Sequence, residues 1–115
     1  MRAKSGIEIK TPEQIQAMRR AGLVVARTLR VVREAVKPGL STADLNDLAV
    51  REIEGAGATP SFLNYHGYPA VICTSPNEVI VHGIPRPDAI LHEGDIVSID
   101  CGAIVDGWHG DAAIT

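Results

Sequence analysis

The chain has 115 residues, of which 45% are hydrophobic and 22% charged, a balance typical of globular proteins that excludes disordered and collagen-like classes. Residues 1–86 hold all eleven Lys and Arg residues and eight acidic residues, whereas residues 87–115 hold six acidic residues and no Lys or Arg. The net charge of −3 argues against a nucleic-acid-binding surface, and the acidic C-terminal segment needs solvent or a cation beside it.

The sequence carries no sign of export or membrane insertion. No apolar run approaches the roughly 20 residues that a membrane helix needs, and the N-terminal segment lacks the apolar core of a secretory signal. Cys73 and Cys101 are too few for a disulfide framework. We therefore expect a cytoplasmic protein of one small domain that binds neither membranes nor nucleic acid.

The first predicted helix begins after Thr11, which forms a capping box with Gln14, and it ends at Lys37–Gly39. A single apolar stripe follows the cap, and Gly22 within it would let another element approach closely. We interpret the arginines on the rest of the helix as a solvated surface rather than a phosphate-binding face. The stripe consists of Ile15, Met18, Gly22, Val25, Leu29, Val32 and Val36.

A second helix is predicted to begin near Ser41 and to close at Gly55 and Gly57. Two short strands follow, at residues 71–74 and 78–81, separated by a turn that contains Pro76. The expected buried face of the second helix consists of Leu45, Leu48, Ala49 and Ile53.

The last element is predicted to be a hairpin, because an Asp-Gly pair at 106–107 interrupts two alternating segments. If Val105 lies opposite Trp108, Asp100 and Asp111 share one face of the hairpin. Their carboxylates are then diagonal neighbours, and their direct cross-strand partners are a glycine and an alanine.

Three interpretations of the two aspartates remain open. Unpaired carboxylates this close repel each other, and a divalent cation with oxygen ligands relieves the repulsion. The same residues also fit a solvent-facing strand with scattered acids, or a metal-free acid–base pair. The remaining residues of that face are mostly small, and this favours a sheltered site over a solvent face.

His82 is the histidine best placed to enter a site, because it ends an apolar segment beside a Gly-Ile-Pro turn. A lone histidine is, however, more often a structural hydrogen-bonding residue than a catalyst. Three of the four aromatic residues lie within seven positions, which indicates the wall of an apolar pocket or the packing of a loop. The candidate pocket residues are Phe62, Tyr65, His66, Tyr68 and Cys73.

Four motifs in this order and spacing resemble the type I methionine aminopeptidases, in the short bacterial form. The resemblance covers nearly all of the chain, including the first helix. The motifs are YHGYP at 65–69, NEVIVHGIP at 77–85, GDIVSID at 94–100 and DGWHGD at 106–111.

This resemblance implies an α+β pita-bread fold, with two helices packed on an antiparallel sheet in its N-terminal half. It implies a metal-dependent aminopeptidase that removes the N-terminal methionine from nascent proteins, close to the ribosome. Asp100 and Asp111 would bind two divalent ions (Co, Mn, Fe or Zn), and His82 would act on the substrate. The methionine side chain would be bound by Phe62, Tyr65, His66, Tyr68 and Cys73.

The resemblance also implies that residues 1–115 form only the N-terminal half of the catalytic domain. One histidine and two glutamates of the family's metal site belong to the second half, so we expect this chain alone to be weakly active or inactive. We further expect an uncovered apolar sheet face. The alternatives are an Xaa-Pro aminopeptidase-like hydrolase and an inactive binding module of the same fold.

Overall fold

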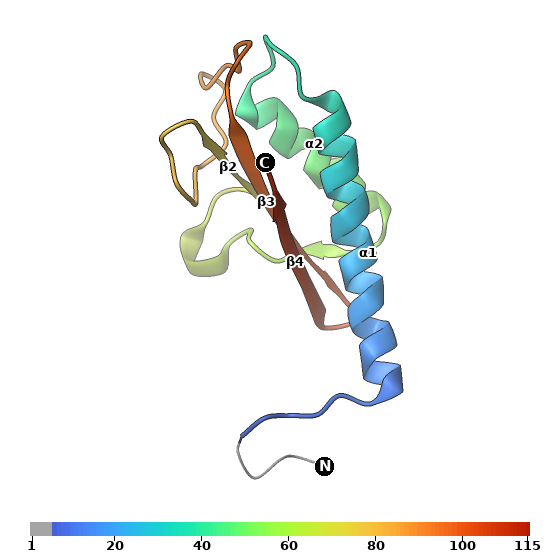
Figure 1. Ribbon diagram of the computed structural model, residues 1–115. Coiled ribbons are helices and arrows are strands. Elements are labelled where there is room, and N and C mark those ends of the chain that lie inside the picture. Colours follow the sequence, from blue (N-terminus) through green and yellow to red (C-terminus); the bar gives the residue numbers. More distant parts are fainter. Residues whose placement is uncertain (1–5) are drawn as a thin grey trace.

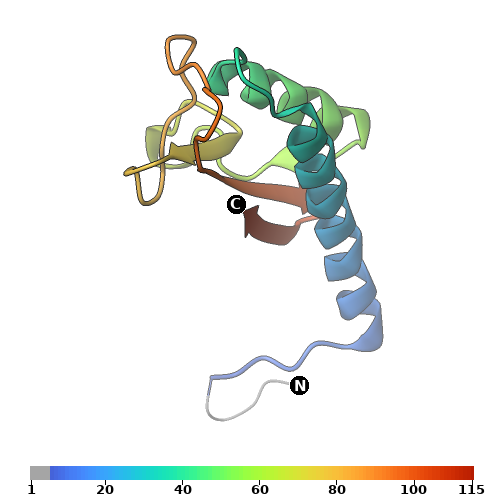
Figure 2. The same cartoon turned by 45° about the horizontal axis from the view of Figure 1, so that its top comes forward.

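A four-stranded antiparallel sheet, covered on one side by two helices, organises the computed structural model, which describes residues 6–115 (Figures 1 and 2). β3 is central: β4 pairs along one edge, and β1 and β2 pair in succession along the other. The elements are α1 (Pro12–Ala35), α2 (Thr42–Gly55), β1 (Thr59–Pro60), the short 3-10 helix η1 (Tyr65–Gly67), β2 (Ile72–Pro76), β3 (Val97–Val105) and β4 (Trp108–Ile114).

Both helices begin at side-chain caps that satisfy their free backbone N–H groups. The Thr11 hydroxyl accepts from the Gln14 N–H at 3.2 Å, and the Thr11 N–H donates to the Gln14 side chain at 2.9 Å. Ser41 and Asp44 form the same reciprocal arrangement at the start of α2. The predicted capping box and both predicted helices are therefore confirmed.

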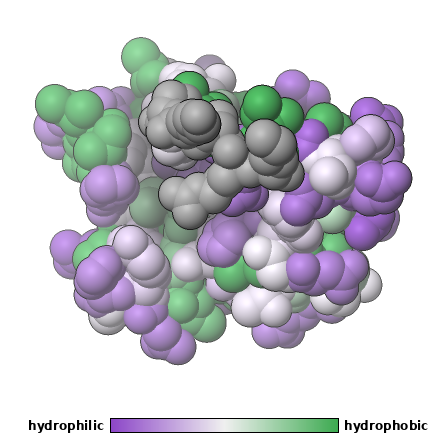
Figure 3. Space-filling model, turned by 90° about the horizontal axis from the view of Figure 1, so that it is seen from below, coloured by the Kyte–Doolittle hydropathy of each residue, from purple (hydrophilic) through white to green (hydrophobic). Residues whose placement is uncertain are grey.

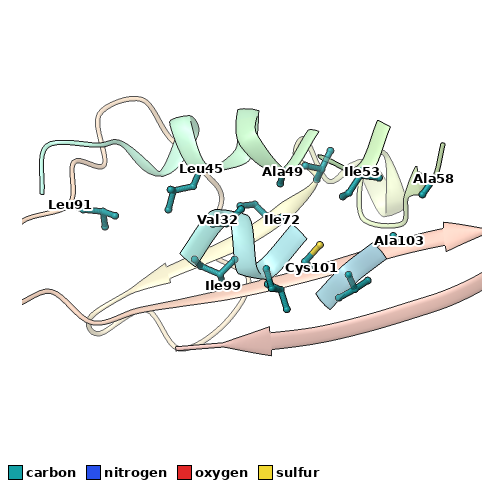
Figure 4. Packing of buried hydrophobic residues seen from close by; sticks show 13 residues of the cluster. Val32, Leu45, Ala49, Ile53, Ala58, Ile72, Leu91, Ile99, Cys101 and Ala103 are labelled. Carbon is teal, nitrogen blue, oxygen red and sulfur yellow. The ribbon is translucent and has the colours of Figure 1, made fainter. Parts of the chain in front are cut away.

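The hydrophobic core lies between the two helices and the sheet, as Figure 4 shows. Leu45, Ala49 and Ile53 of α2 and Val32 of α1 face Ile72, Ile99 and Cys101 on the strands (Figure 4). These side chains are fully or almost fully buried. The core fixes the helices on one face of the sheet, and the opposite face of β2 and β3 remains available for a site.

The predicted stripe on α1 is correct in its second half and wrong in its first half. Val25, Leu29 and Val32 are buried, but Ile15 and Met18 are exposed, and Ala17 and Ala21 are buried in their place. The cause is the close approach of β4, which leaves room for alanine but not for a long side chain.

That approach depends on Gly110 rather than on Gly22. A Cβ atom at Gly110 would lie 2.9 Å from backbone atoms of Ala21 and Gly22, whereas a Cβ at Gly22 would meet nothing within 4 Å. The predicted close approach at this part of α1 exists, but the residue that permits it is on the strand.

Replacing Gly110 with Ala should destabilise the fold by about 1–3 kcal/mol, because two backbone segments must separate. The matched control is Gly22→Ala, which adds a methyl group in open space and should stabilise the helix by up to about 1 kcal/mol. Urea unfolding midpoints measure both changes. Equal midpoints for Gly110→Ala and the unchanged chain would contradict the proposed contact.

The strand expected at residues 78–81 does not form. The chain turns at Asn77, which has a left-handed φ of 51°, and Ile80 is 86% exposed. The chain rejoins β2 only at Gly83, whose carbonyl accepts from the Thr74 N–H at 2.8 Å. The run of strand-favouring residues was misleading here because these residues have no neighbouring strand in the described part of the chain.

Large apolar side chains are exposed mainly outside the sheet. Those of β3 and β4 are at most partly exposed, so the expected bare apolar sheet face is not found in residues 6–115. On the face seen in Figure 3, apolar groups alternate with polar ones. Within the same residues, neither helix is both long and apolar enough to span a membrane. The most exposed large apolar residues are Ile7, Ile9, Tyr65, Ile80, Val81 and Ile96.

Candidate active site

The β3–β4 hairpin has the register that the sequence predicts. Asp106 and Gly107 both adopt positive φ values, 49° and 80°, as a two-residue type I′ turn requires. Val105 therefore pairs with Trp108, and Asp111 lies opposite Gly102. Because Asp100 lies opposite Ala113, the two aspartates are diagonal neighbours on one face.

The surroundings of the two carboxylates are unfavourable for two negative charges. One carboxylate oxygen of Asp100, Oδ1, is buried and has no hydrogen-bond partner within the described residues. Burial, and then the neighbouring Asp100 carboxyl group, together raise the pKa of Asp111 from 3.8 to about 6. A buried oxygen without a partner, beside a second carboxylate, destabilises the folded state, and a bound cation would remove this destabilisation.

Cys73 and Tyr68 lie beside Asp100. Cys73 of β2 is the direct cross-strand partner of Asp100, so their side chains share the same face of the sheet. Burial raises the pKa of the Cys73 thiol, which therefore stays protonated at neutral pH. Burial, and then contact with Cys73, also raises the pKa of Tyr68, so its hydroxyl remains a hydrogen-bond donor.

The loop after β1 covers the sheet next to the aspartates. A Cβ atom at Gly102 would lie 2.2 Å from the Ser61 hydroxyl and 2.9 Å from the Phe62 ring, so both residues sit directly over this glycine. The Phe62 and Tyr68 rings meet edge to face, with centroids 6.4 Å apart. Phe62 and Tyr68 thus lie together on the face of the sheet that carries Asp100 and Cys73.

The other predicted site residues lie farther out. Tyr65 is 67% exposed, and its ring meets that of His66 edge to face at 4.3 Å. His82 and His109 are exposed as well. The structure therefore brings Phe62, Tyr68, Cys73 and the two aspartates together, and leaves the Tyr65–His66 pair and the His82 side chain at the rim.

The two aspartates fit a divalent cation but do not complete a site. Carboxylate oxygens suit hard and borderline divalent ions, and the Asp100 oxygen has no other partner among residues 6–115. Within those residues, no group of three or more His, Cys, Asp or Glu side chains is arranged to hold a metal ion. A stable hydrolytic site needs at least one more ligand than this chain supplies.

Ser75 and Gly83 belong to the site region, although sequence reasoning did not single them out. The Ser75 hydroxyl accepts from the Gly83 N–H at 3.1 Å, and the Gly83 carbonyl accepts from the Tyr68 hydroxyl at 3.2 Å. Ser75 lies two residues beyond Cys73 on the same strand and therefore on the same face. The two-residue spacing in the sequence could have placed Ser75 on the same face as Cys73. Its contact with Gly83 could not be foreseen, because it depends on the path of the loop between Ser75 and Gly83.

Residues 16–115 match the family described as metallopeptidase family M24. The chain belongs to metallopeptidase family M24. It is 52% identical to methionine aminopeptidase 1 of Mycobacterium tuberculosis over 115 residues, which is all of this chain and 43% of that protein. It is 53% identical to the methionine aminopeptidase of Clostridium acetobutylicum, covering 95% of this chain and 44% of that one. The chain thus spans less than half the length of these M24 relatives.

Solved structures of the M24 family show the same fold. The methionine aminopeptidase of Rickettsia prowazekii superimposes with a TM-score of 0.90 at 47% identity, over 93% of this chain and 43% of that chain. The prolidase of Pyrococcus furiosus, at 19% identity and a TM-score of 0.77, shares the fold alone. The expected fold class is confirmed: two helices on an antiparallel sheet, as in one half of the pita-bread fold. As a member of a metallopeptidase family, the chain belongs to proteins that use divalent metal ions.

Proposed function

We propose that residues 1–115 form the N-terminal half of the catalytic domain of a metal-dependent aminopeptidase that removes N-terminal methionine. The observation that carries this proposal is the placement of Asp100 and Asp111 on one sheet face, with one Asp100 oxygen buried and unpartnered among the described residues. Identity above 50% to two methionine aminopeptidases supports the same activity.

In this proposal Asp100 and Asp111 supply ligands to two divalent ions (Co, Mn, Fe or Zn), and the remaining ligands come from outside these residues. Divalent ions in such a site supply Lewis-acid activation of water and of the scissile carbonyl. The raised pKa of Asp111 comes from burial and from the neighbouring Asp100 carboxyl group, and such shifts cluster at functional sites.

The substrate is proposed to be the N-terminal methionine of a nascent protein. Its thioether side chain would lie against Phe62, Tyr68 and Cys73, on the face of the sheet that carries Asp100. Tyr65 and His66 would line the outer part of this pocket, and His82 would contact the substrate near the scissile amide. The location is proposed to be the cytoplasm, close to the ribosome, and two free cysteines agree with a reducing compartment.

The test is peptide hydrolysis by the natural gene product that contains these residues, supplied with Co²⁺ or Mn²⁺. We expect cleavage of Met-Ala peptides and no preference for Xaa-Pro peptides, and we expect little or no turnover by the 115-residue chain alone. Preferential cleavage of Xaa-Pro peptides would contradict the proposed specificity. If the natural gene product cleaves neither kind of peptide, it is a binding module. Full activity of the 115-residue chain would contradict the proposal that its metal site is incomplete.

A further inference from the structure

The backbone of Gly83 makes two hydrogen bonds to β2 and a third to the Tyr68 side chain. Its N–H donates to the Ser75 hydroxyl at 3.1 Å, and its carbonyl accepts from the Thr74 N–H at 2.8 Å. The Tyr68 hydroxyl shares its one proton between the same carbonyl, at 3.2 Å, and the Ile72 carbonyl, at 3.0 Å. Two side chains, Tyr68 and Ser75, therefore bind opposite ends of one residue in an otherwise exposed loop.

The fit around Gly83 allows no side chain. A Cβ atom there would lie 2.0 Å from the Thr74 carbonyl oxygen, and that oxygen belongs to the backbone of β2. Gly83 is thus packed directly against the β2 backbone, and its hydrogen bonds set the distance of this part of the loop from the sheet.

His82, which precedes Gly83, has a left-handed backbone with a φ of 58°. A non-glycine residue in this region is strained by roughly 1–2 kcal/mol, and it persists only where its surroundings impose it. The His82 side chain is exposed, so its conformation is imposed by the backbone attachment of the next residue.

We propose that Tyr68 and Ser75 are positioning residues for His82. Ser75 and Cys73 share one face of β2, and Cys73 pairs directly with Asp100. The hydrogen bonds to Gly83 therefore set the position of His82 relative to the strand that carries Asp100. This role is separate from the lining of a pocket by the Tyr68 ring, because it depends on the hydroxyl group alone. It rests on the proposed function only in that His82 acts on the substrate.

The first test is structural and uses NMR of the natural gene product that contains these residues. Ser75→Ala removes the acceptor of the Gly83 N–H and should raise the exchange rate of that amide roughly 2- to 10-fold. Tyr68→Phe removes a donor to the Gly83 carbonyl and should raise the same rate by a smaller factor, because it only loosens the attachment of the loop. Both variants should also weaken the NOE between the amide proton and the α proton of His82, which is strong when φ is positive. Tyr65→Phe, which removes a hydroxyl from an exposed ring, should change neither signal.

The second test separates positioning from pocket lining. In the same gene product, Tyr68→Phe keeps the ring, so the KM for a Met-Ala peptide should stay near its original value while kcat falls roughly 2- to 10-fold. A rise in KM with unchanged kcat would assign Tyr68 to the pocket alone and overturn the proposal. Unchanged Gly83 and His82 signals in both variants would also overturn it. If the unmodified product lacks peptidase activity, the proposed function fails, and the NMR result still decides the positioning role.

Discussion

Asp111→Asn is expected to stabilise the metal-free chain at pH 7 while removing most of the peptidase activity of the natural gene product. In the folded chain, burial and the Asp100 carboxyl group raise the pKa of Asp111 from 3.8 to about 6. The folded state thus binds this proton more tightly than the unfolded state does. The resulting stabilisation is complete below about pH 4 and is lost as the pH rises through about 6.

At pH 7 the unchanged chain carries an ionised Asp111 in an unfavourable environment, and asparagine removes that cost. Because Asp111 is still solvent-accessible, we expect a gain of about 1 kcal/mol rather than the full value of the pKa shift. The same substitution removes a proposed metal ligand. Loss of a residue that only hydrogen-bonds to a metal ligand lowers activity roughly 10- to 100-fold. Loss of a ligand itself should lower the activity by more than that.

The measurement is thermal unfolding of the metal-free chain at pH 4 and pH 7, with and without the substitution. The melting temperature of Asp111→Asn should exceed that of the unchanged chain at pH 7, and the difference should shrink at pH 4. Asp106→Asn is the matched control, because Asp106 is exposed and its turn accepts Asn-Gly as readily as Asp-Gly. Equal melting temperatures at pH 7 for the unchanged chain, Asp111→Asn and Asp106→Asn would show that the ionised Asp111 does not destabilise the fold.

Local patterns predicted the fold well where a backbone rule decides the outcome. The Thr11 capping box, the helix ends and the turn at 106–107 follow from short sequence signals, and the hairpin turn alone fixes which face holds Asp100 and Asp111. A one-residue slip in register would have separated the two carboxylates.

Predictions failed where packing between distant segments decides the outcome. Ile15 and Met18 continue the periodicity of α1, but the approach of Gly110 selects Ala17 and Ala21 for burial. Residues 78–81 are of types that favour strands, yet they pair with no strand in the described part of the chain, and the loop packs closely against β2 at Gly83. The roles of Ser75 and Gly83 were hidden for the same reason, because their contact joins residues that sequence spacing does not relate.

The central claim is that Asp100 and Asp111 form part of a divalent-metal site, and paramagnetic line broadening by Mn²⁺ tests it most directly. In the 115-residue chain, sub-stoichiometric Mn²⁺ should broaden first the amide signals of Asp100, Asp111 and their strand neighbours Cys73 and Ala113. The four other acids of the same acidic segment, Asp88, Glu93, Asp95 and Asp106, serve as internal controls. Broadening centred on the two aspartates and abolished by Asp111→Asn is the predicted result. Broadening that centres on the control acids, or that survives the substitution unchanged, would contradict the account.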